Sequence, residues 1–123
     1  MELNIKIAGH SIPLSNREKK GKSFIAFPKE YCMVDIETTG YSPAWDNIIE
    51  IGAIRYLEGK ETDRFQTLVQ PPFYYDDEDN EIYVSEFIEE LTGITNEMLK
   101  TAPCEKEAIA AFSEFLGDSI ILG

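Results

Sequence analysis

The chain has 123 residues, of which 43% are hydrophobic, and this length allows one domain with a core of its own. Its formal charge of −12 argues against a protein that binds nucleic acid through a broadly basic surface. The two cysteines, Cys32 and Cys104, form no zinc-binding pattern, and neither a signal peptide nor a continuous apolar span is present. We therefore expect a soluble protein of a reducing compartment such as the cytoplasm, without a membrane partner.

The basic residues are concentrated at the start of the chain. Residues 1–30 hold six of the eleven Lys and Arg residues but only three of the twenty-three acids. We expect an N-terminal arm or linker over residues 1–30 and a separate domain over residues 31–123. Within the arm, apolar residues alternate with polar ones over residues 3–7 and predict a short hairpin. Residues 15–22 predict a solvated linker, with a phosphate-contacting segment as the alternative.

An apolar run ending in two acids comes directly after the arm. Residues 31–37 predict a strand whose buried face carries Cys32, Val34 and Ile36, with Cys32 as a core thiol. Alternate side chains of a strand share a face, so Asp35 and Glu37 should point the same way, about 7 Å apart along the strand. Such a pair can bind a divalent cation, and paired cations are the usual apparatus of phosphodiester cleavage. The alternative is an exposed strand end with two solvated acids.

Two further strands are predicted after a short connection. Residues 47–56 predict an interior strand covered on both faces. Glu50 lies within it and needs a hydrogen-bond or charge partner. We interpret Glu50 as a structural anchor behind the acidic strand, with a site residue as the alternative. A tight connection at residues 58–60 leads to a third strand, residues 63–70, which stops at two prolines. Short connections favour three antiparallel strands.

The remaining residues predict an insertion, helices and a last strand. Residues 73–81 are aromatic and acidic but lack the spacing of a calcium loop, which favours a solvated, mobile insertion over a metal site. Short helices are predicted over residues 84–91 and after a capping Thr95, and a longer one from residue 103 to Gly117. Residues 120–122 predict the start of another buried strand. The expected buried stripe of the long helix is Ala108, Ala111, Phe112 and Phe115.

Four segments, taken together and in order, resemble the DnaQ-like, or DEDD, 3′-to-5′ exonucleases, which include proofreading subunits of bacterial DNA polymerases. The match covers about residues 31–123 and is far more specific than any single short motif. The segments are Asp-Ile-Glu-Thr-Thr-Gly at 35–40, Ile-Ile-Glu-Ile-Gly-Ala at 48–53, Phe-Gln-Thr-Leu-Val at 65–69, and Leu-Thr-Gly-Ile-Thr at 91–95, which is followed by Met98-Leu99 and Ala102-Pro103.

The resemblance implies an α/β, ribonuclease-H-like fold: a mixed sheet with three antiparallel strands followed by helices, truncated before the later strands. It implies a metal-dependent 3′-to-5′ exonuclease that removes nucleotides from DNA 3′ ends. In such enzymes Asp35 would bridge two Mg²⁺ or Mn²⁺ ions and Glu37 would bind one of them. The backbone N–H groups of Thr38, Thr39 and Gly40 would contact the terminal nucleotide. The implied partners are the 3′ end of single-stranded DNA, with RNA as an option, and a DNA polymerase.

The chain departs from the family pattern after the first motif. The family's second motif, an Asp, and its third, a His or Tyr with an Asp after it, have no counterpart before Gly123. His10 cannot replace the missing base because it precedes the first motif. We therefore expect the front part of a catalytic domain, inactive or barely active alone. The competing hypothesis is a non-catalytic interaction module that docks on a polymerase or another partner.

Overall fold

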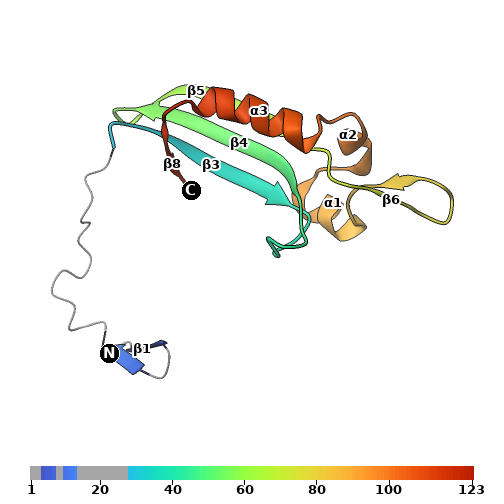
Figure 1. Ribbon diagram of the computed structural model, residues 1–123, viewed down its shortest axis with the longest axis horizontal. Helices are drawn as coiled ribbons and strands as arrows, with labels where there is room; N and C mark the ends of the chain where they lie inside the picture. The colour runs from blue at the N-terminus through green and yellow to red at the C-terminus, as the bar shows by residue number, and fades with distance from the viewer. Residues whose placement is uncertain (1–3, 8–9, 14–27) are drawn as a thin grey trace.

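The centre of the molecule is a four-stranded sheet with helices on one side (Figure 1). The structure is a computed structural model that describes residues 4–7, 10–13 and 28–123. The strand order is β5-β4-β3-β8, with β8 parallel to β3 and the other pairs antiparallel. This confirms the predicted mixed α/β architecture. The strands are β3 (Glu30–Thr38), β4 (Ile48–Leu57), β5 (Lys60–Leu68) and β8 (Ile120–Leu122).

The connection between β4 and β5 is the predicted tight turn. Glu58 and Gly59 have φ values of 50° and 79°, both in the left-handed region. Two successive residues of positive φ give a two-residue hairpin turn whose twist matches that of the flanking strands. Strand β5 therefore begins at Lys60, three residues before the predicted start.

Local capping signals fix the ends of the helices. The hydroxyl of Ser85 accepts a hydrogen bond from the Ile88 N–H, and that of Thr95 accepts one from the Met98 N–H. Gly93, with φ 75°, ends the first helix in the left-handed conformation. All three predicted helices are confirmed. They are α1 (Glu86–Thr92), α2 (Asn96–Lys100) and α3 (Glu105–Leu116).

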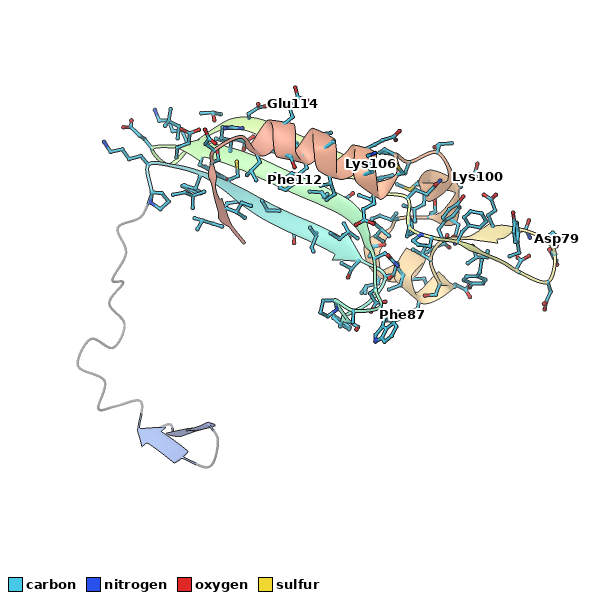
Figure 2. The ribbon with its side chains drawn as sticks, in the orientation of Figure 1. Asp79, Phe87, Lys100, Lys106, Phe112 and Glu114 are labelled. Atoms are coloured by element: carbon cyan, nitrogen blue, oxygen red, sulfur yellow. The ribbon has the colours of Figure 1, made fainter. Side chains whose placement is uncertain are left out.

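Helix α3 covers one face of the sheet. Phe112 points from α3 toward the strands, whereas Glu114 points away from them (Figure 2). The ring of Phe65 on β5 lies 5.8 Å from that of Phe112 and 5.3 Å from that of Phe115. Ala108 is buried as predicted, but Ala111 is exposed, so its assignment to the core is wrong. Ala111 lies beside the row of α3 residues that packs on the strands, and its side chain is exposed to solvent.

A second apolar cluster closes the end of the sheet. Ile49 of β4, which is fully buried, packs against residues of α1, α2 and the segment before α1. This packing places the two short helices beside the end of β3, where the acidic pair lies (Figure 1). The other buried members of the cluster are Tyr83, Val84, Ile88, Ile94 and Leu99.

The opposite face of the sheet carries no helix among residues 28–123 (Figure 1). The prediction that the second strand is covered on both faces is therefore wrong: Ile54 is only half-buried, and its neighbour Met33 on β3 is exposed. The assignment of Ile36 to a buried face of β3 is wrong, since its side chain is 46% exposed near the end of the strand. The prediction of a buried last strand is also wrong. Ile120 and Ile121 of β8 are about half exposed, at 53% and 52%, because β8 forms the edge of the sheet.

The acidic, aromatic insertion is largely exposed to solvent, as expected, and forms a small hairpin of β6 (Tyr74–Tyr75) and β7 (Glu81–Ile82). The Asp76 carboxylate accepts hydrogen bonds from the backbone N–H groups of Glu78 and Asn80, at 2.8 and 2.9 Å. The hydrogen bonds from Asn80 keep the pKa of Asp76 below its usual value. One carboxylate thus accepts the hydrogen bonds of the turn N–H groups and holds the turn that joins the two strands.

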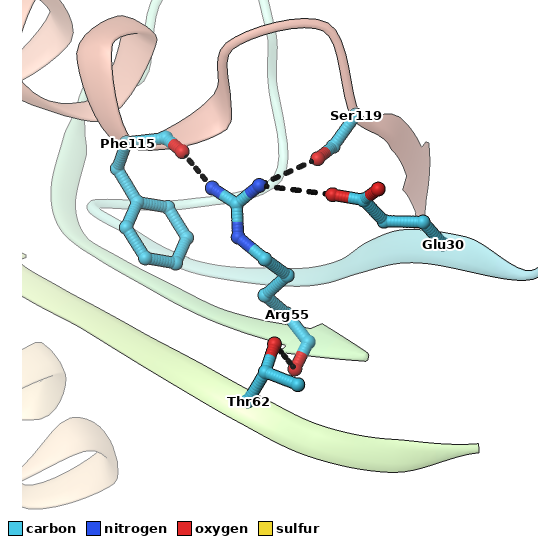
Figure 3. Close-up of polar contacts among 5 residues, drawn as sticks. All are labelled: Glu30, Arg55, Thr62, Phe115 and Ser119. Carbon is cyan, nitrogen blue, oxygen red and sulfur yellow. Dashed lines mark hydrogen bonds and ion pairs between the residues drawn. The ribbon is translucent and has the colours of Figure 1, made fainter. Parts of the chain in front are cut away.

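Arg55 joins the end of α3 to the sheet (Figure 3). Its guanidinium donates to the Phe115 carbonyl, to Ser119 Oγ at 2.9 Å and to Glu30 Oε1 at 3.3 Å. It also lies over the Phe115 ring, 4.9 Å from the centroid. These contacts hold the turn that leads from α3 into β8.

The predicted N-terminal hairpin is confirmed as β1 (Asn4–Ile7) paired with β2 (His10–Pro13). The expected linker over residues 15–22 lies outside the described residues. The described residues contain no helix long and apolar enough to span a membrane.

The apolar cluster around α2 makes a stability prediction. Leu99 is fully buried, so Leu99→Ala should lower the free energy of unfolding by about 2–5 kcal/mol. The matched control is Leu91→Ala, which truncates a side chain that is 61% exposed and should cost less than about 1 kcal/mol. Urea denaturation of the two variants measures the difference. Equal losses would contradict the assignment of the core.

Candidate active site

The two acids of β3 lie on the open face of the sheet. Asp35 is opposite Gly52 of β4, and Glu37 is opposite Glu50. Directly opposed residues of an antiparallel pair share a face, and so do alternate residues of one strand. Asp35, Glu37 and Glu50 therefore point to the side of the sheet that α3 leaves uncovered.

The acidic side chains differ in their partners. The exposed Asp35 accepts one hydrogen bond, from the Ile36 N–H to Oδ1 at 3.1 Å. The carboxylate of the half-buried Glu37 accepts no hydrogen bond from residues 28–123. Glu50 Oε2 accepts one from Gln66 Nε2 at 3.0 Å. Glu50 thus lies beside the acidic pair, and its expected position behind the strand is wrong.

The Asp46 carboxylate closes the loop that connects β3 to β4. Its Oδ1 accepts from the hydroxyl of Thr39 at 3.0 Å, and its Oδ2 accepts from the Ser42 N–H at 2.9 Å. Thr39 also binds Asn47 twice, because its Oγ1 accepts from the Asn47 N–H at 3.0 Å and its N–H donates to the Asn47 carbonyl at 2.9 Å. The Thr39 N–H is therefore already occupied within the loop.

Gly40 is required by this loop for space. A Cβ at position 40 would lie 2.5 Å from Asp46 Oδ2 and 2.7 Å from its Cγ, closer than Cβ atoms come to other atoms. The absence of a side chain at Gly40 thus lets the carboxylate reach the middle of the loop. Among residues 28–123, the Gly40 N–H itself donates to no acceptor.

A hollow of about 870 Å³ lies between this loop and α1. Glu37, Thr38, Thr39 and Gly40 line one side of it. Phe87 and Leu91 line the other side and are 65% and 61% exposed. Figure 2 shows Phe87 projecting from α1 away from the body of the protein. The hollow therefore joins one of the two acids to an apolar wall.

Phe87 and Leu91 were not predicted as site residues from the sequence. They are four residues apart on α1, and the buried Ile88, three residues before Leu91, lines the hollow beside them. An apolar stripe on a short helix is a sequence signal that could have found them.

Asp35 does not line this hollow. It borders a shallower one of about 500 Å³ on the open sheet face, with Gly52, Glu50 and Gln66. Because Gly52 carries no side chain, the space opposite Asp35 is open. The structure thus brings Glu37 together with the predicted nucleotide-contacting residues and leaves Asp35 on the adjacent open surface.

The acidic pair offers part of the ligand set of a divalent cation. Carboxylate oxygens are the donors that Mg²⁺ and Mn²⁺ prefer, and both acids are open to solvent or to the hollow. The described part of the chain holds no group of three or more His, Cys, Asp or Glu residues that could bind a metal ion. The two carboxylates are donors of the kind that Mg²⁺ and Mn²⁺ prefer, but two side chains do not complete the coordination of such an ion.

Comparison with known proteins identifies the family of the chain. The sequence model described as Exonuclease (RNase_T) matches residues 32–123, which include the acidic strand and the hollow. The chain belongs to the exonuclease family. Over 93 residues it is 36% identical to the DNA polymerase III subunit epsilon of Aquifex aeolicus, covering 76% of this chain and 42% of that relative. It is 38% identical over 94 residues to the PolC-type DNA polymerase III of Latilactobacillus sakei, covering 76% and 6%.

Solved structures of exonucleases share the fold. Escherichia coli exonuclease I in complex with an oligonucleotide has a TM-score of 0.59 at 23% identity, with 78% of this chain and 20% of that one covered. The nuclease domain of 3′hExo, a DEDDh family member bound to rAMP, has a TM-score of 0.56 at 24% identity, with 71% and 43% covered. This member of the exonuclease family thus spans less than half the length of these relatives.

The loop geometry of this exonuclease-family chain makes a second prediction. Gly40→Ala should destabilise the protein by about 1–3 kcal/mol, because the new methyl group must displace the Asp46 carboxylate. Gly52→Ala is the matched control: its Cβ would meet only the Asp35 carbonyl oxygen at 3.8 Å, an ordinary contact.

Urea denaturation measures the stability of both variants, and hydrogen exchange of the Ser42 amide reports the loop directly. A Gly40→Ala variant that keeps both the stability and the Ser42 protection of the parent would refute the role of Asp46.

Proposed function

We propose that the chain is the metal-binding front part of a 3′-to-5′ exonuclease that removes nucleotides from DNA ends. The observation that carries this proposal is the position of Asp35 and Glu37: both lie on the open sheet face, and Glu37 borders the hollow beside α1. A substrate phosphate can reach this position without displacing any helix of residues 28–123.

Asp35 and Glu37 have the proposed roles of metal ligands. By family resemblance, Asp35 and Glu37 would hold the Mg²⁺ or Mn²⁺ ions of the site. When bound, such ions supply a nucleophilic water at neutral pH and stabilise the departing 3′ oxygen. The register supports this assignment because Glu37 directly opposes Glu50. Two like charges in this position repel each other, and a bound cation would offset that repulsion.

The hollow has the proposed role of holding the terminal nucleotide. Phe87 and Leu91 offer an apolar wall against which a base can pack. Of the predicted N–H donors, that of Thr39 is used within the loop, whereas that of Gly40 faces no acceptor among residues 28–123. We therefore assign nucleotide contact to Gly40 and to the neighbouring Thr38. Thr39 holds the loop in shape.

We propose that the remaining ligands and the general base come from residues outside those described. This agrees with the relatives, which are longer than the chain, and one of which is a subunit of DNA polymerase III. We propose a cytoplasmic role beside a DNA polymerase and a DNA 3′ end as the substrate, with RNA as the alternative.

A Mn²⁺ titration tests the metal assignment. Asp35→Asn and Glu37→Gln should each weaken Mn²⁺ binding at least tenfold, a loss of about 1.4 kcal/mol, because each removes a charged oxygen ligand. The control Glu78→Gln removes the same charge from the exposed β6–β7 turn and should leave the affinity unchanged. Isothermal titration calorimetry gives the three affinities. Identical values for all variants and the parent would favour the non-catalytic docking module.

The incomplete ligand set makes a separate prediction about activity. Residues 1–123 alone should degrade 3′-labelled single-stranded DNA with Mg²⁺ very slowly or not at all. Full turnover, with loss of activity in Asp35→Asn, would show that this chain supplies a complete site. An assay at several Mg²⁺ concentrations distinguishes weak metal binding from the absence of a catalytic group.

A further inference from the structure

The loop between β3 and β4 holds a tryptophan out in solvent. Trp45, the single tryptophan of the chain, is 86% exposed, and its ring contacts no other aromatic ring among residues 28–123. Tryptophan is a large side chain that is highly buried on average. An indole held in water beside a candidate binding site therefore indicates a surface that binds something flat and apolar.

The backbone around Trp45 is fixed by the loop itself. The N–H groups of Trp45 and Asp46 both donate to the Ser42 carbonyl, at 3.2 and 2.8 Å. The Asp46 side chain turns inward to Thr39 and Ser42. The ring is thus presented from a hydrogen-bonded turn, so a ligand that stacks on it does not have to order the backbone first.

Trp45 lies at the border of the hollow between the β3–β4 loop and α1. Pro43 and Asp46 line the hollow, whereas Trp45 lies between them in the sequence and outside the lining. Asp46 is the only charged residue from Thr38 to Asn47, and its carboxylate is used inside the loop. The loop surface that continues from the hollow to Trp45 therefore carries no free charge.

We propose that Trp45 is a stacking platform for an unpaired base of single-stranded nucleic acid whose 3′ terminal nucleotide occupies the hollow. This inference rests on the proposed function of that hollow. A base stacks on an aromatic ring through its face, so the platform accepts any sequence and needs no positive charge. This property suits a chain with a formal charge of −12, in which repulsion opposes contacts to phosphates. The platform would bind a base upstream of the terminal nucleotides.

The test uses the full chain in Ca²⁺ and two oligothymidylates that differ only in length, a dinucleotide and an octanucleotide. Because Trp45 is the sole tryptophan, selectively excited fluorescence reports its ring alone. The octanucleotide should quench this fluorescence and the dinucleotide should not, since only the longer strand reaches past the hollow. Anisotropy of labelled oligonucleotides gives the affinities.

The variants separate stacking from binding in the hollow. Trp45→Ala should weaken octanucleotide binding about tenfold and leave dinucleotide binding unchanged, whereas Trp45→Phe should restore most of the loss. Phe87→Ala should weaken both oligonucleotides because Phe87 lines the hollow. Tyr74→Ala is the matched control, since it removes an aromatic ring that is 61% exposed on β6, outside the hollow lining.

The outcomes are distinguishable. If Phe87→Ala weakens dinucleotide binding but Trp45→Ala leaves octanucleotide binding intact, the hollow binds nucleotides and the stacking platform is refuted. If the octanucleotide quenches Trp45 and depends on it while the dinucleotide does not bind, stacking stands and the proposed use of the hollow fails. If no oligonucleotide changes the fluorescence, the inference is wrong.

Discussion

The packing of α3 on a single face of the sheet decides where every side chain of β3 points. Ala108 and Phe112 bury against β4 and β5, and this contact fixes which residues of each strand face the core. Because side chains alternate along a strand, the same contact sends Asp35 and Glu37 to the other face. A shift of one residue in the β3–β4 register would turn both carboxylates toward the apolar helix, at a cost of several kcal/mol for each buried charge. The stability of the core and the position of the acidic pair therefore have one cause.

Asp35 and Asp46, which lie on either side of the end of β3, have different roles. The carboxylate of Asp46 is held by Thr39 and Ser42, and Gly40 makes room for it, so its charge serves the shape of the loop. Among residues 28–123, the carboxylate of Asp35 accepts only the hydrogen bond of its neighbour, and it faces open space across from Gly52. An acid that the fold uses for its own hydrogen bonds has few lone pairs left for a ligand, whereas an acid with one local contact keeps them. This contrast separates the structural carboxylate from the candidate metal ligand within a short stretch of sequence.

The accuracy of the sequence-based predictions depended on the range of the interactions that decide each feature. Turns and helix ends depend on residues close in sequence, so Gly59, Gly93 and the capping Thr95 marked their elements correctly. The common face of Asp35 and Glu37 could be predicted from strand periodicity alone. Burial depends on which distant elements meet, and there the predictions failed for Ala111 and for β8. The hairpin of residues 74–82 was missed because a run of acids indicates solvation, while Asp76 binds the turn internally. The apolar wall of the hollow could not be predicted, since it exists only where α1 meets the loop.

The acidity of the chain is consistent with a nucleic-acid substrate once the positions of the charges are considered. Arg55 is used to hold the α3–β8 turn, and Arg64 pairs with Glu61, so neither guanidinium is free for a phosphate. In the proposed function, cations that the acidic pair collects would supply attraction for phosphate at the open face, which would make binding dependent on divalent ions. Away from the cations, uncharged contacts to the bases are more favourable than contacts to the phosphates. The neutral surface formed by Phe87, Leu91 and the 43–45 turn provides such contacts directly beside Glu37. In the proposed function, the negative charge of this chain would thus divide the binding between metal ions at the reacting phosphate and base stacking along the strand.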